Sequence, residues 1–492
     1  MRVIKKIDET VLAKTIERCR ERKIVIPTFA EQADPTKVPE KVKRRLKDVG
    51  MQDANPLNLF RITWMNEPKE KGGLYNQGNW IEFPSEVTGV SARLIGLVGK
   101  HFPIGAHKVG AAFGCLVPRL VSGEFDPATQ KAAWPSTGNF CRGGAFDSAL
   151  LACKAIAILP EGMSKERFEW LRSIGTDEII ATPGTESNVK EIYDKCWELR
   201  KERKGAVCIF NQFEEFGNAL WHYHVTGTAM QRVYEQVAQP GSRFAAYISA
   251  TGSAGTISAG DYLRTRHPHI KVVATEALQC PTLLRNGWGA HRIEGIGDKH
   301  VPWIHNVRNT DMVSAIDDEQ CMSLLRLFNE EEGQSFLASH GVKKEFIDQL
   351  PLVGISGLCN MIAAAKVAKF YEMSSRDVML FPITDSMDLY RSRKQELREE
   401  CGAYDRELAA RHYGRYVEGT QPDGLRELGY WDRKALHNLK YFTWVEQQGK
   451  DSADLNAMWE PDFWSETFAQ VDEWDKLIGQ FNDRAGVLKS LD

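Results

Sequence analysis

Short apolar runs alternate with amphipathic stretches through the middle of the chain, and this alternation predicts strands and helices in turn. Apolar runs at 155–160, 178–182 and 206–210 are typical of buried strands. The stretches 164–173 and 187–201 between them carry apolar residues at helical spacing. Because strands alternate with helices at this spacing, the sequence predicts a parallel α/β sheet.

The same pattern continues toward the C-terminus and stops near residue 390. Apolar runs at 244–249, 271–276 and 378–382 are predicted strands with helical stretches between them. Residues 1–79 are charged and punctuated by proline, and residues 390–492 are charged and rich in tryptophan. We therefore expect a catalytic core over residues 80–389, flanked by an N-terminal extension and a mostly helical C-terminal extension.

Length and composition narrow the class of protein. A chain of 492 residues exceeds one compact core, so two or more lobes are expected. The net charge of −3, spread over charges of both signs, gives no reason to expect nucleic acid, and the apolar runs are too short to cross a membrane. Ten cysteines without a Cys-x-x-Cys pair, and a start without a secretory pattern, favour free thiols in a cytoplasmic protein; no metal site is expected.

One glycine-alanine turn places a lysine at the start of a predicted helix. Gly105-Ala106-His107-Lys108-Val109-Gly110 runs into a small-residue apolar stretch, so Lys108 is expected near a helix start. The helix dipole and apolar neighbours would both lower the pKa of its amine, as a Schiff-base lysine requires. Taken alone, the same lysine also fits a surface position with its amine in water.

Three turns after predicted strands carry the small and hydroxyl residues that bind anions and ligands. Ser136-Thr137-Gly138-Asn139 and residues 250–257 each lead into a helix, whose N-terminus gathers N–H donors. The second turn lacks the Walker lysine and the Gly-x-Gly-x-x-Gly pattern, and on its own it also fits a structural turn. Thr384-Asp385-Ser386 follows the last strand, where open α/β sheets bind ligands.

Taken in order, these motifs resemble the fold-type-II pyridoxal-phosphate enzymes, the group that contains cysteine synthase, cystathionine β-synthase and the tryptophan synthase β subunit. The similarity spans about residues 80 to 390. It implies two parallel-sheet, three-layer α/β lobes of the tryptophan synthase β type with the cofactor between them, the smaller lobe at about 115–225 being inserted in the larger. The motifs that carry it are Gly105 to Val109, Ser136 to Asn139, Asn211-Gln212-Phe213, Thr251 to Thr256, Glu294-Gly295-Ile296-Gly297 and Phe381 to Ser386.

The resemblance implies pyridoxal 5'-phosphate as cofactor and a role for each motif. Lys108 is the expected catalytic residue, which holds the cofactor as a Schiff base and moves the α-proton of the substrate. Asn139 is expected beside the ring hydroxyl, and Ser386, or Thr384 as second choice, beside the ring nitrogen. The cofactor phosphate is assigned to Thr251, Gly252, Ser253, Ala254, Gly255 and Thr256. The substrate is assigned to Ser136, Thr137, Gly138, Gln212 and Gly295.

A hydroxyl beside the ring nitrogen favours one class of reaction. Unlike an aspartate, it does not keep the nitrogen protonated, so the ring is a weaker electron sink and loss of a β-substituent to give an aminoacrylate is favoured. We expect a lyase or transferase of amino-acid metabolism that acts on a serine- or cysteine-like amino acid by β-elimination or β-replacement. A non-catalytic binding protein of the same fold and a nucleotide-binding α/β enzyme remain as alternatives.

Arg142 carries the most specific hypothesis about the substrate. A cation just past the Gly138-Asn139 turn could bind a second anionic group on the substrate, such as a side-chain carboxylate or a sulfonate. A structural salt bridge is the alternative. By resemblance we also expect a homodimer and a small amino acid, rather than a nucleic acid or membrane, as the binding partner.

Overall fold

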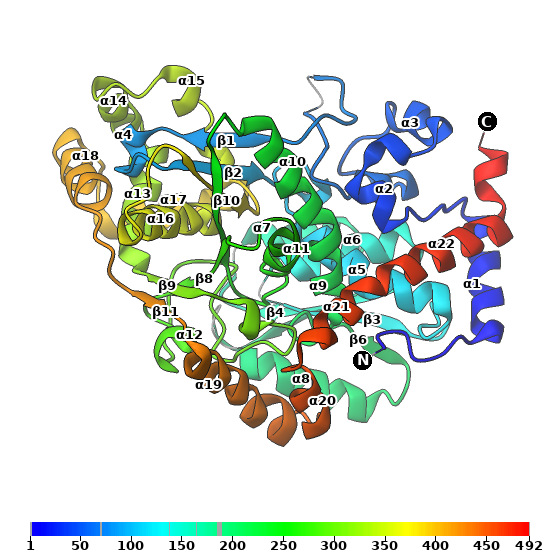
Figure 1. The fold of residues 1–492 in the computed structure, drawn as a ribbon. Coiled ribbons are helices and arrows are strands. Elements are labelled where there is room, and N and C mark those ends of the chain that lie inside the picture. The colour runs from blue at the N-terminus through cyan, green and yellow to red at the C-terminus, as the bar shows by residue number, and fades with distance from the viewer. Residues whose placement is uncertain (1, 69–70, 137, 164, 185–188, 492) are drawn as a thin grey trace.

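The chain folds around two sheets, and a computed structural model describes residues 2–68, 71–136, 138–163, 165–184 and 189–491 (Figure 1). The seven-stranded sheet has the order β1 (Trp80–Phe83), β2 (Arg93–Val98), β10 (Asp377–Ile383), β7 (Arg243–Ala250), β8 (Lys271–Ala277), β9 (Met312–Ile316) and β11 (Leu425–Glu427). The four-stranded sheet has the order β5 (Glu178–Thr182), β4 (Lys154–Pro160), β3 (Lys131–Pro135) and β6 (Val207–Ile209).

Parallel pairing dominates both sheets, which confirms the predicted α/β class. The four-stranded sheet is parallel throughout, and in the larger sheet only the two outer pairs are antiparallel. Six of the seven residues of β4 are buried, as its apolar run requires for a strand covered on both faces. Strand β11 comes from the C-terminal part of the chain and extends the edge of the larger sheet beside β9.

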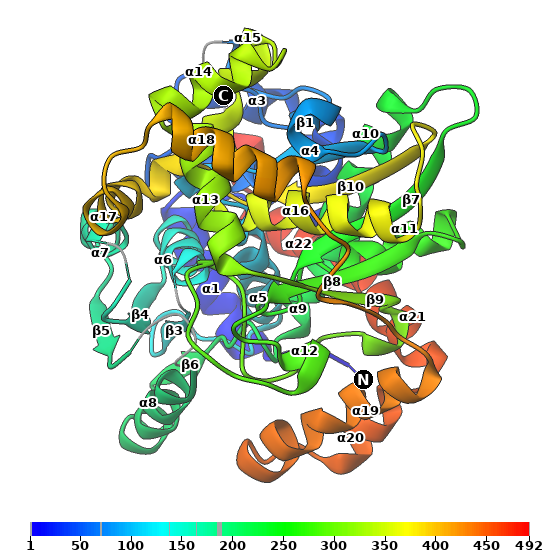
Figure 2. The ribbon, with the colours of Figure 1, turned by 90° about the vertical axis from the view of Figure 1, so that its left-hand side faces the viewer.

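Helices cover both faces of the larger sheet. Neighbouring residues Tyr247 and Ile248 of β7 belong to apolar clusters on opposite faces, because successive side chains of a strand point to opposite sides. Figure 2 shows the smaller sheet with α7 and α8 on one side of the molecule and the larger sheet on the other. The helices of the core are α4 (Ser85–Thr88), α5 (Lys108–Ser122), α6 (Asn139–Leu150), α7 (Lys165–Ser173), α8 (Val189–Glu202), α9 (Phe216–Trp221), α10 (Gly227–Val237), α11 (Ser258–Arg266), α12 (Thr282–Arg285), α13 (Asp318–Asn329), α14 (Glu331–Ser339), α15 (Lys344–Ile347) and α16 (Ile355–Phe370).

Two glycines let helices α5 and α9 cross in backbone contact. A Cβ added at Gly114 would lie 2.3 Å from the carbonyl oxygen of Gly217, and one at Gly217 would lie 2.1 Å from that of Gly114. Pro118, one turn further along α5, has no N–H to donate to the Gly114 carbonyl. The contact therefore fixes α5, and with it Lys108 at its first position, against the rest of the core.

The two ends of the chain pack together on the core. Arg20 of α1 donates to the carbonyl of Ala485 at the end of α22 over 3.1 Å, and the two helices lie side by side in Figure 1. Trp444 is fully buried and donates to the carbonyl of Val301 in the core over 2.9 Å. The terminal helices are α1 (Glu9–Glu21), α2 (Phe29–Ala33), α3 (Glu40–Leu46), α17 (Arg391–Cys401), α18 (Arg406–Tyr413), α19 (Tyr430–Lys440), α20 (Ser452–Ala457), α21 (Pro461–Ala469) and α22 (Val471–Ala485).

The division of the chain at residues 79 and 389 stays a prediction.

Among the described residues, no helix has both the length and the apolar character that crossing a bilayer requires.

Candidate active site

One cavity collects most of the residues that the sequence motifs single out. It opens where strands of both sheets end, because the turns after β3, β6, β7 and β10 all reach it. The predicted residues that line it are Lys108, Ser136, Asn139, Gln212, Gly252, Ser253, Ala254, Thr256, Gly295 and Thr384.

Lys108 is the first residue of α5, and its amine faces neutral partners. The Nζ atom donates to Gln212 Oε1 over 3.0 Å and to Ser253 Oγ over 3.1 Å. Burial lowers the pKa of Lys108 from 10.5 to about 8. His107 beside it is buried, and burial together with the charge of Lys108 holds its pKa well below 6.5. The cavity therefore contains an amine that is partly neutral at physiological pH and an uncharged imidazole.

The turn between β7 and α11 presents unpaired main-chain donors. Within the described part of the chain, the N–H groups of residues 252–256 have no hydrogen-bond acceptor. Gly255 is required here, because an added Cβ would lie 2.0 Å from the Oδ1 atom of Asn218. Thr256 bonds Ser249 through its hydroxyl over 2.8 Å. Free amides at the start of a helix form a binding site for an anion such as phosphate.

The turn after β3 lies on the other side of Lys108. Ser136 Oγ accepts hydrogen bonds from the amide of Gly138 over 3.1 Å and from the side chain of Gln212 over 3.3 Å. Gly138 itself does not line the cavity but backs onto Arg167, whose guanidinium forms an ion pair with Glu294 over 3.1 Å. Thr137 lies outside the described residues.

Comparison with known proteins identifies the family to which this chain belongs. A family model described as "Pyridoxal-phosphate dependent enzyme" matches residues 99–342. A Bacillus subtilis protein named "Probable cysteine synthase" is 30% identical over 232 residues, which cover 47% of this chain and 72% of that relative. The chain belongs to this family. As a pyridoxal-phosphate-dependent enzyme it has pyridoxal phosphate as its cofactor.

Other relatives of this pyridoxal-phosphate-dependent enzyme are cysteine synthases and proteins of similar fold. Cysteine synthase of Staphylococcus aureus (strain Mu50) is 31% identical over 200 residues, which cover 40% of this chain and 62% of the relative. The chain thus matches less than two thirds of the length of that relative. The crystal structure of O-acetyl serine sulfhydrylase isoform 3 from Entamoeba histolytica superimposes with a TM-score of 0.55 at 20% identity, covering 68% of this chain and 92% of that one. This likeness shows the fold, which agrees with the predicted tryptophan synthase β type.

The residues present fit the cofactor of the family. A primary amine with a lowered pKa can react with its aldehyde, and the free amides of residues 252–256 suit its phosphate. Two further groups lie where the cavity approaches β10. Asn139 donates to Asp385 Oδ2 over 2.7 Å, and the hydroxyls of Ser356 and Thr384 are 2.7 Å apart.

Several predicted residues do not line the cavity that contains Lys108. Thr251 instead donates to the carbonyl of Thr275 over 3.1 Å, and Gly255 packs against Asn218 behind the turn between β7 and α11. Ser386 points into a neighbouring cavity that Arg142 also lines. Thr384, the second choice for the ring nitrogen, therefore lines the cavity that contains Lys108, whereas Ser386 does not.

Arg142 is held by contacts behind Asn139. Its guanidinium donates to the carbonyl of Ile104 over 3.0 Å and to Asn139 Oδ1 over 3.3 Å, and it lies 4.7 Å from the ring centre of Trp170. Burial, followed by the charge of Arg167, lowers the pKa of Arg142 to about 10. The side chain thus steadies Asn139 from outside the Lys108 cavity.

Three polar residues of the cavity were missed by reasoning from the sequence. From the sequence, Ser356 received no role, and Asp385 was named only as part of the turn after the last strand. Asp298 follows the Gly295 to Gly297 segment and is 5% exposed, yet neither carboxylate oxygen has a hydrogen-bond partner in the described chain. The Nδ1 atom of the His300 imidazole lies 3.5 Å from Oδ1. A sequence signal existed only for Asp298, as an acidic residue next to a recognised motif.

Proposed function

We propose that this enzyme catalyses β-elimination or β-replacement on a serine- or cysteine-like amino acid. The observation that carries the proposal is the position of the Lys108 amine, which faces Gln212 and Ser253 in the same cavity as the free amides of residues 252–256. The names of the relatives supply the reaction class, since those from Bacillus subtilis and Staphylococcus aureus are cysteine synthases. When bound, pyridoxal phosphate supplies an electron sink for the substrate's α-carbon.

The chain contributes the groups that hold the cofactor and move a proton. We assign cofactor attachment and transfer of the substrate's α-proton to Lys108, whose amine has the lowered pKa that this work requires. We assign the phosphate to the turn from Thr251 to Thr256, whose amides at 252–256 have no acceptor in the described chain. The Thr251 hydroxyl, bonded to the Thr275 carbonyl, and Gly255, packed against Asn218, hold the turn in place. We assign contact with the ring hydroxyl to Asn139, which also lines the cavity.

The ring nitrogen is assigned to the hydroxyl pair of Ser356 and Thr384 rather than to Ser386. Both hydroxyls line the cavity and lie 2.7 Å apart, so one can donate to the nitrogen while accepting from the other. A hydroxyl partner leaves the nitrogen unprotonated, which supports β-chemistry over transamination. Asp385 also lines the cavity, where its carboxyl accepts hydrogen bonds from Asn139 and Tyr390, and burial raises its pKa.

The substrate carboxylate is assigned to the turn that begins at Ser136. Ser136, Gln212 and Gly295 line the cavity around Lys108, and Gly138 and Thr137 complete this turn in the sequence. Arg142 acts as a positioning residue, because its contacts reach Asn139 and not the cavity.

We assign Asp298 to proton transfer to the substituent that leaves the β-carbon of the substrate. It lines the cavity, is buried, and has two oxygens without a hydrogen-bond partner in the described chain. In this role Asp298 acts as a general acid, which gives a proton to the departing thiolate or alkoxide and is left as the carboxylate. The nearby imidazole of His300 can return the proton from solvent.

A product assay tests the function. The purified enzyme is supplied with pyridoxal phosphate and mixed separately with L-cysteine, L-serine and O-acetyl-L-serine, with and without sulfide or homocysteine. Release of ammonia and pyruvate identifies β-elimination, and a new thioether or thiol amino acid identifies β-replacement. Lys108→Ala is the matched control and should abolish both. Turnover of alanine, which has no leaving group, in preference to all of these would contradict the proposal.

We also propose a cytoplasmic homodimer. All ten cysteines are free thiols, which agrees with a reducing compartment. Trp431 at the start of α19 is 80% exposed, as an aromatic residue at a subunit contact would be in one isolated chain. Light scattering of the enzyme and of Trp431→Ser tests the dimer, and a monomeric parent enzyme would contradict it.

A further inference from the structure

The segment that follows Asp298 is buried but irregular. Residues 299–306 form no strand or helix, yet Val301 and Trp303 are almost fully buried. Within the described chain, the carbonyls of Val301 and Trp303 receive no main-chain hydrogen bond. Because buried carbonyls are normally paired, this segment requires donors from another part of the molecule.

Helix α19 and the turn that continues it supply these donors. Trp444 Nε1 donates to the carbonyl of Val301 over 2.9 Å. Lys440 Nζ donates to the carbonyls of Trp303 over 2.9 Å and of His305 over 2.7 Å. Lys440 is fully buried, and burial lowers the pKa of its amine well below 10.5. The lysine therefore serves here as a hydrogen-bond donor and not as a surface charge.

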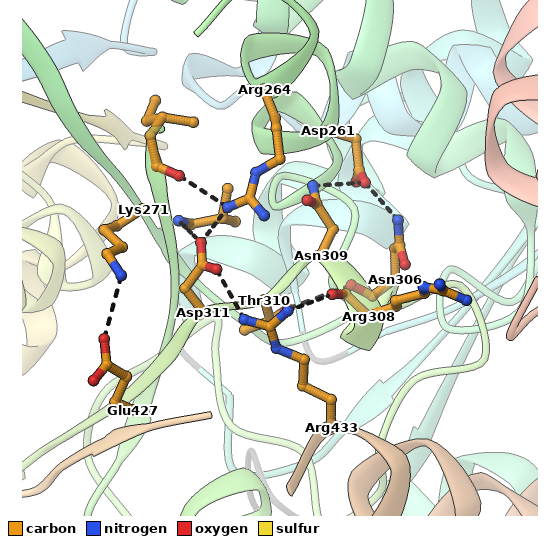
Figure 3. A network of polar contacts seen from close by, with 12 residues as sticks. Asp261, Arg264, Lys271, Asn306, Arg308, Asn309, Thr310, Asp311, Glu427 and Arg433 are labelled. Atoms are coloured by element: carbon orange, nitrogen blue, oxygen red, sulfur yellow. Dashed lines mark hydrogen bonds and ion pairs between the residues drawn. The ribbon is translucent and has the colours of Figure 1, made fainter. Parts of the chain in front are cut away.

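A third donor from α19 fixes the far end of the same segment to the larger sheet. Arg433 donates to the carbonyl of Arg308 over 3.1 Å and to the carboxylate of Asp311 over 2.9 Å, as Figure 3 shows. Asp311 also binds Arg264 of α11 and accepts from the amide of Val272 in β8 over 2.8 Å. Helix α19 is thus attached to the core at this point.

The three donors follow one order along the helix. Arg433, Lys440 and Trp444 are seven and four positions apart, so they lie on one face. Trp444 belongs to the π-helical turn Tyr441–Gln447 that continues α19. As the donor numbers rise, the numbers of the bound carbonyls fall from 308 through 305 and 303 to 301. We call these three side chains the donor ladder.

Asp298 lies between the donor ladder and anchors from the core. Its carbonyl accepts from the Thr282 hydroxyl over 2.6 Å, and the amide of Gly297 donates to the carbonyl of Thr251 over 3.2 Å. On the other side the donor ladder begins at Val301, three residues further on. The core therefore fixes the chain up to Asp298, and the C-terminal extension fixes the chain that follows.

The ring of Trp444 provides a second link to Asp298. It packs against the ring of Tyr193 with centroids 6.0 Å apart, and Tyr193 stacks on the imidazole of His300 with centroids 6.1 Å apart. The Nδ1 atom of that imidazole lies 3.5 Å from Asp298 Oδ1. Trp444 is thus linked to the pair formed by Asp298 and His300 through packing as well as through its N–H group.

We propose that Lys440 and Trp444 of the C-terminal extension are positioning residues that hold Asp298 in the active-site cavity. The inference rests on the proposed role of Asp298 in proton transfer. General acid catalysis requires the acid within hydrogen-bond reach of the leaving group, and small displacements of a catalytic group slow a reaction strongly. Removing a donor of the ladder should therefore slow most the reactions whose leaving group must be protonated.

Trp444→Phe tests the donor ladder with little change in packing, because it removes the N–H group and keeps an aromatic ring. Trp464→Phe is the matched control. Trp464 is also buried and donates over 2.9 Å, but to the carbonyl of Met458 within the C-terminal extension itself. Lys440→Met is a second test, which removes two hydrogen bonds and keeps the length of the side chain.

Hydrogen–deuterium exchange of the enzyme loaded with pyridoxal phosphate measures the positioning directly. The amides of Gly297, Ile304 and His305 are hydrogen-bonded, so a peptide over residues 295–305 reports on this segment. We expect Trp444→Phe to speed its exchange about two- to tenfold, the factor that corresponds to one net hydrogen bond, and Lys440→Met to speed it more. Trp464→Phe should leave it unchanged. Equal exchange in the two tryptophan variants would overturn the proposal.

A ratio of two turnover rates measures the effect on the proton. L-serine loses hydroxide, which must be protonated, whereas β-chloro-L-alanine loses chloride, which need not be. We expect Trp444→Phe to lower kcat/KM for L-serine about tenfold relative to that for β-chloro-L-alanine, and Trp464→Phe to keep the ratio. A general loss of folded enzyme lowers both rates together and leaves the ratio unchanged.

Asp298→Asn in the same assay separates the two possible failures. If it lowers the ratio while Trp444→Phe does not, the donor ladder does not position Asp298 and the proposal is overturned. If Asp298→Asn itself leaves the ratio unchanged, the proposed proton-transfer role of Asp298 is wrong. Faster exchange in Trp444→Phe than in Trp464→Phe then still supports the donor ladder, and equal exchange overturns it.

Discussion

The protonation state of Lys108 gives a quantitative prediction for how the enzyme acquires its cofactor. Only a neutral amine attacks the aldehyde of pyridoxal phosphate. Burial lowers the pKa of Lys108 from 10.5 to about 8. At pH 7 about 10% of this amine is then neutral, against about 0.03% for an ordinary lysine. Lys108 should therefore react roughly 300 times more readily than a surface lysine at that pH.

The reaction can be followed by trapping the cofactor on the protein. Cofactor-free enzyme is mixed briefly with pyridoxal phosphate from about pH 6 to about pH 10, reduced with borohydride, and the modified peptides are quantified by mass spectrometry. Because the lowered pKa leaves the amine charged in acid, labelling of Lys108 should rise as pH increases and level off above about 8. Lys108→Arg controls for labelling elsewhere. A midpoint near that of the surface lysines would refute the argument that burial activates Lys108.

Three further substitutions test separate parts of the structure. Asp298→Asn should lower turnover of substrates with poor leaving groups about 100-fold while cofactor absorbance is retained, and equal turnover would exclude Asp298 from proton transfer. Gly114→Ala should lower the free energy of unfolding in denaturant by about 1–3 kcal/mol, because the new Cβ lies 2.3 Å from a carbonyl oxygen. Gly479→Ala in α22, with nothing within 4 Å of the new Cβ, is its control and should not destabilise; similar losses in both would contradict the packing argument. Arg142→Ala should weaken cofactor retention and change KM equally for acidic and neutral substrates, whereas a loss confined to acidic substrates would show that Arg142 binds the substrate.

Local patterns were enough to predict the elements that carry the site. The position of Lys108 at a helix start and the turn from Thr251 to Thr256 depend on residues that are neighbours in the chain. Small and hydroxyl side chains at such turns suit anion binding but also occur in purely structural turns, so the order of the motifs along the chain was needed as well. The resemblance to pyridoxal-phosphate enzymes rested on the order of these motifs, and the family match confirms it.

Contacts between distant segments could not be predicted in the same way. Asn139 and Asp385 are 246 positions apart and meet only because β3 and β10 end at the same cavity. Ser386 was favoured for the ring nitrogen from its place after a strand, but the chain turns so that Thr384 faces the cavity and Ser386 faces away. Arg142 likewise turns toward Asn139 and Ile104.

The sequence by itself determined the alternating strands and helices, the lysine at a helix start and the small-residue turns, because backbone geometry and burial over a few residues dictate them. The tertiary structure alone decided which side chains face the Lys108 cavity and left the Asp298 carboxylate without a hydrogen-bond partner among the described residues. Those outcomes depend on how separate segments pack, and a one-dimensional pattern does not encode the direction in which a side chain leaves its turn.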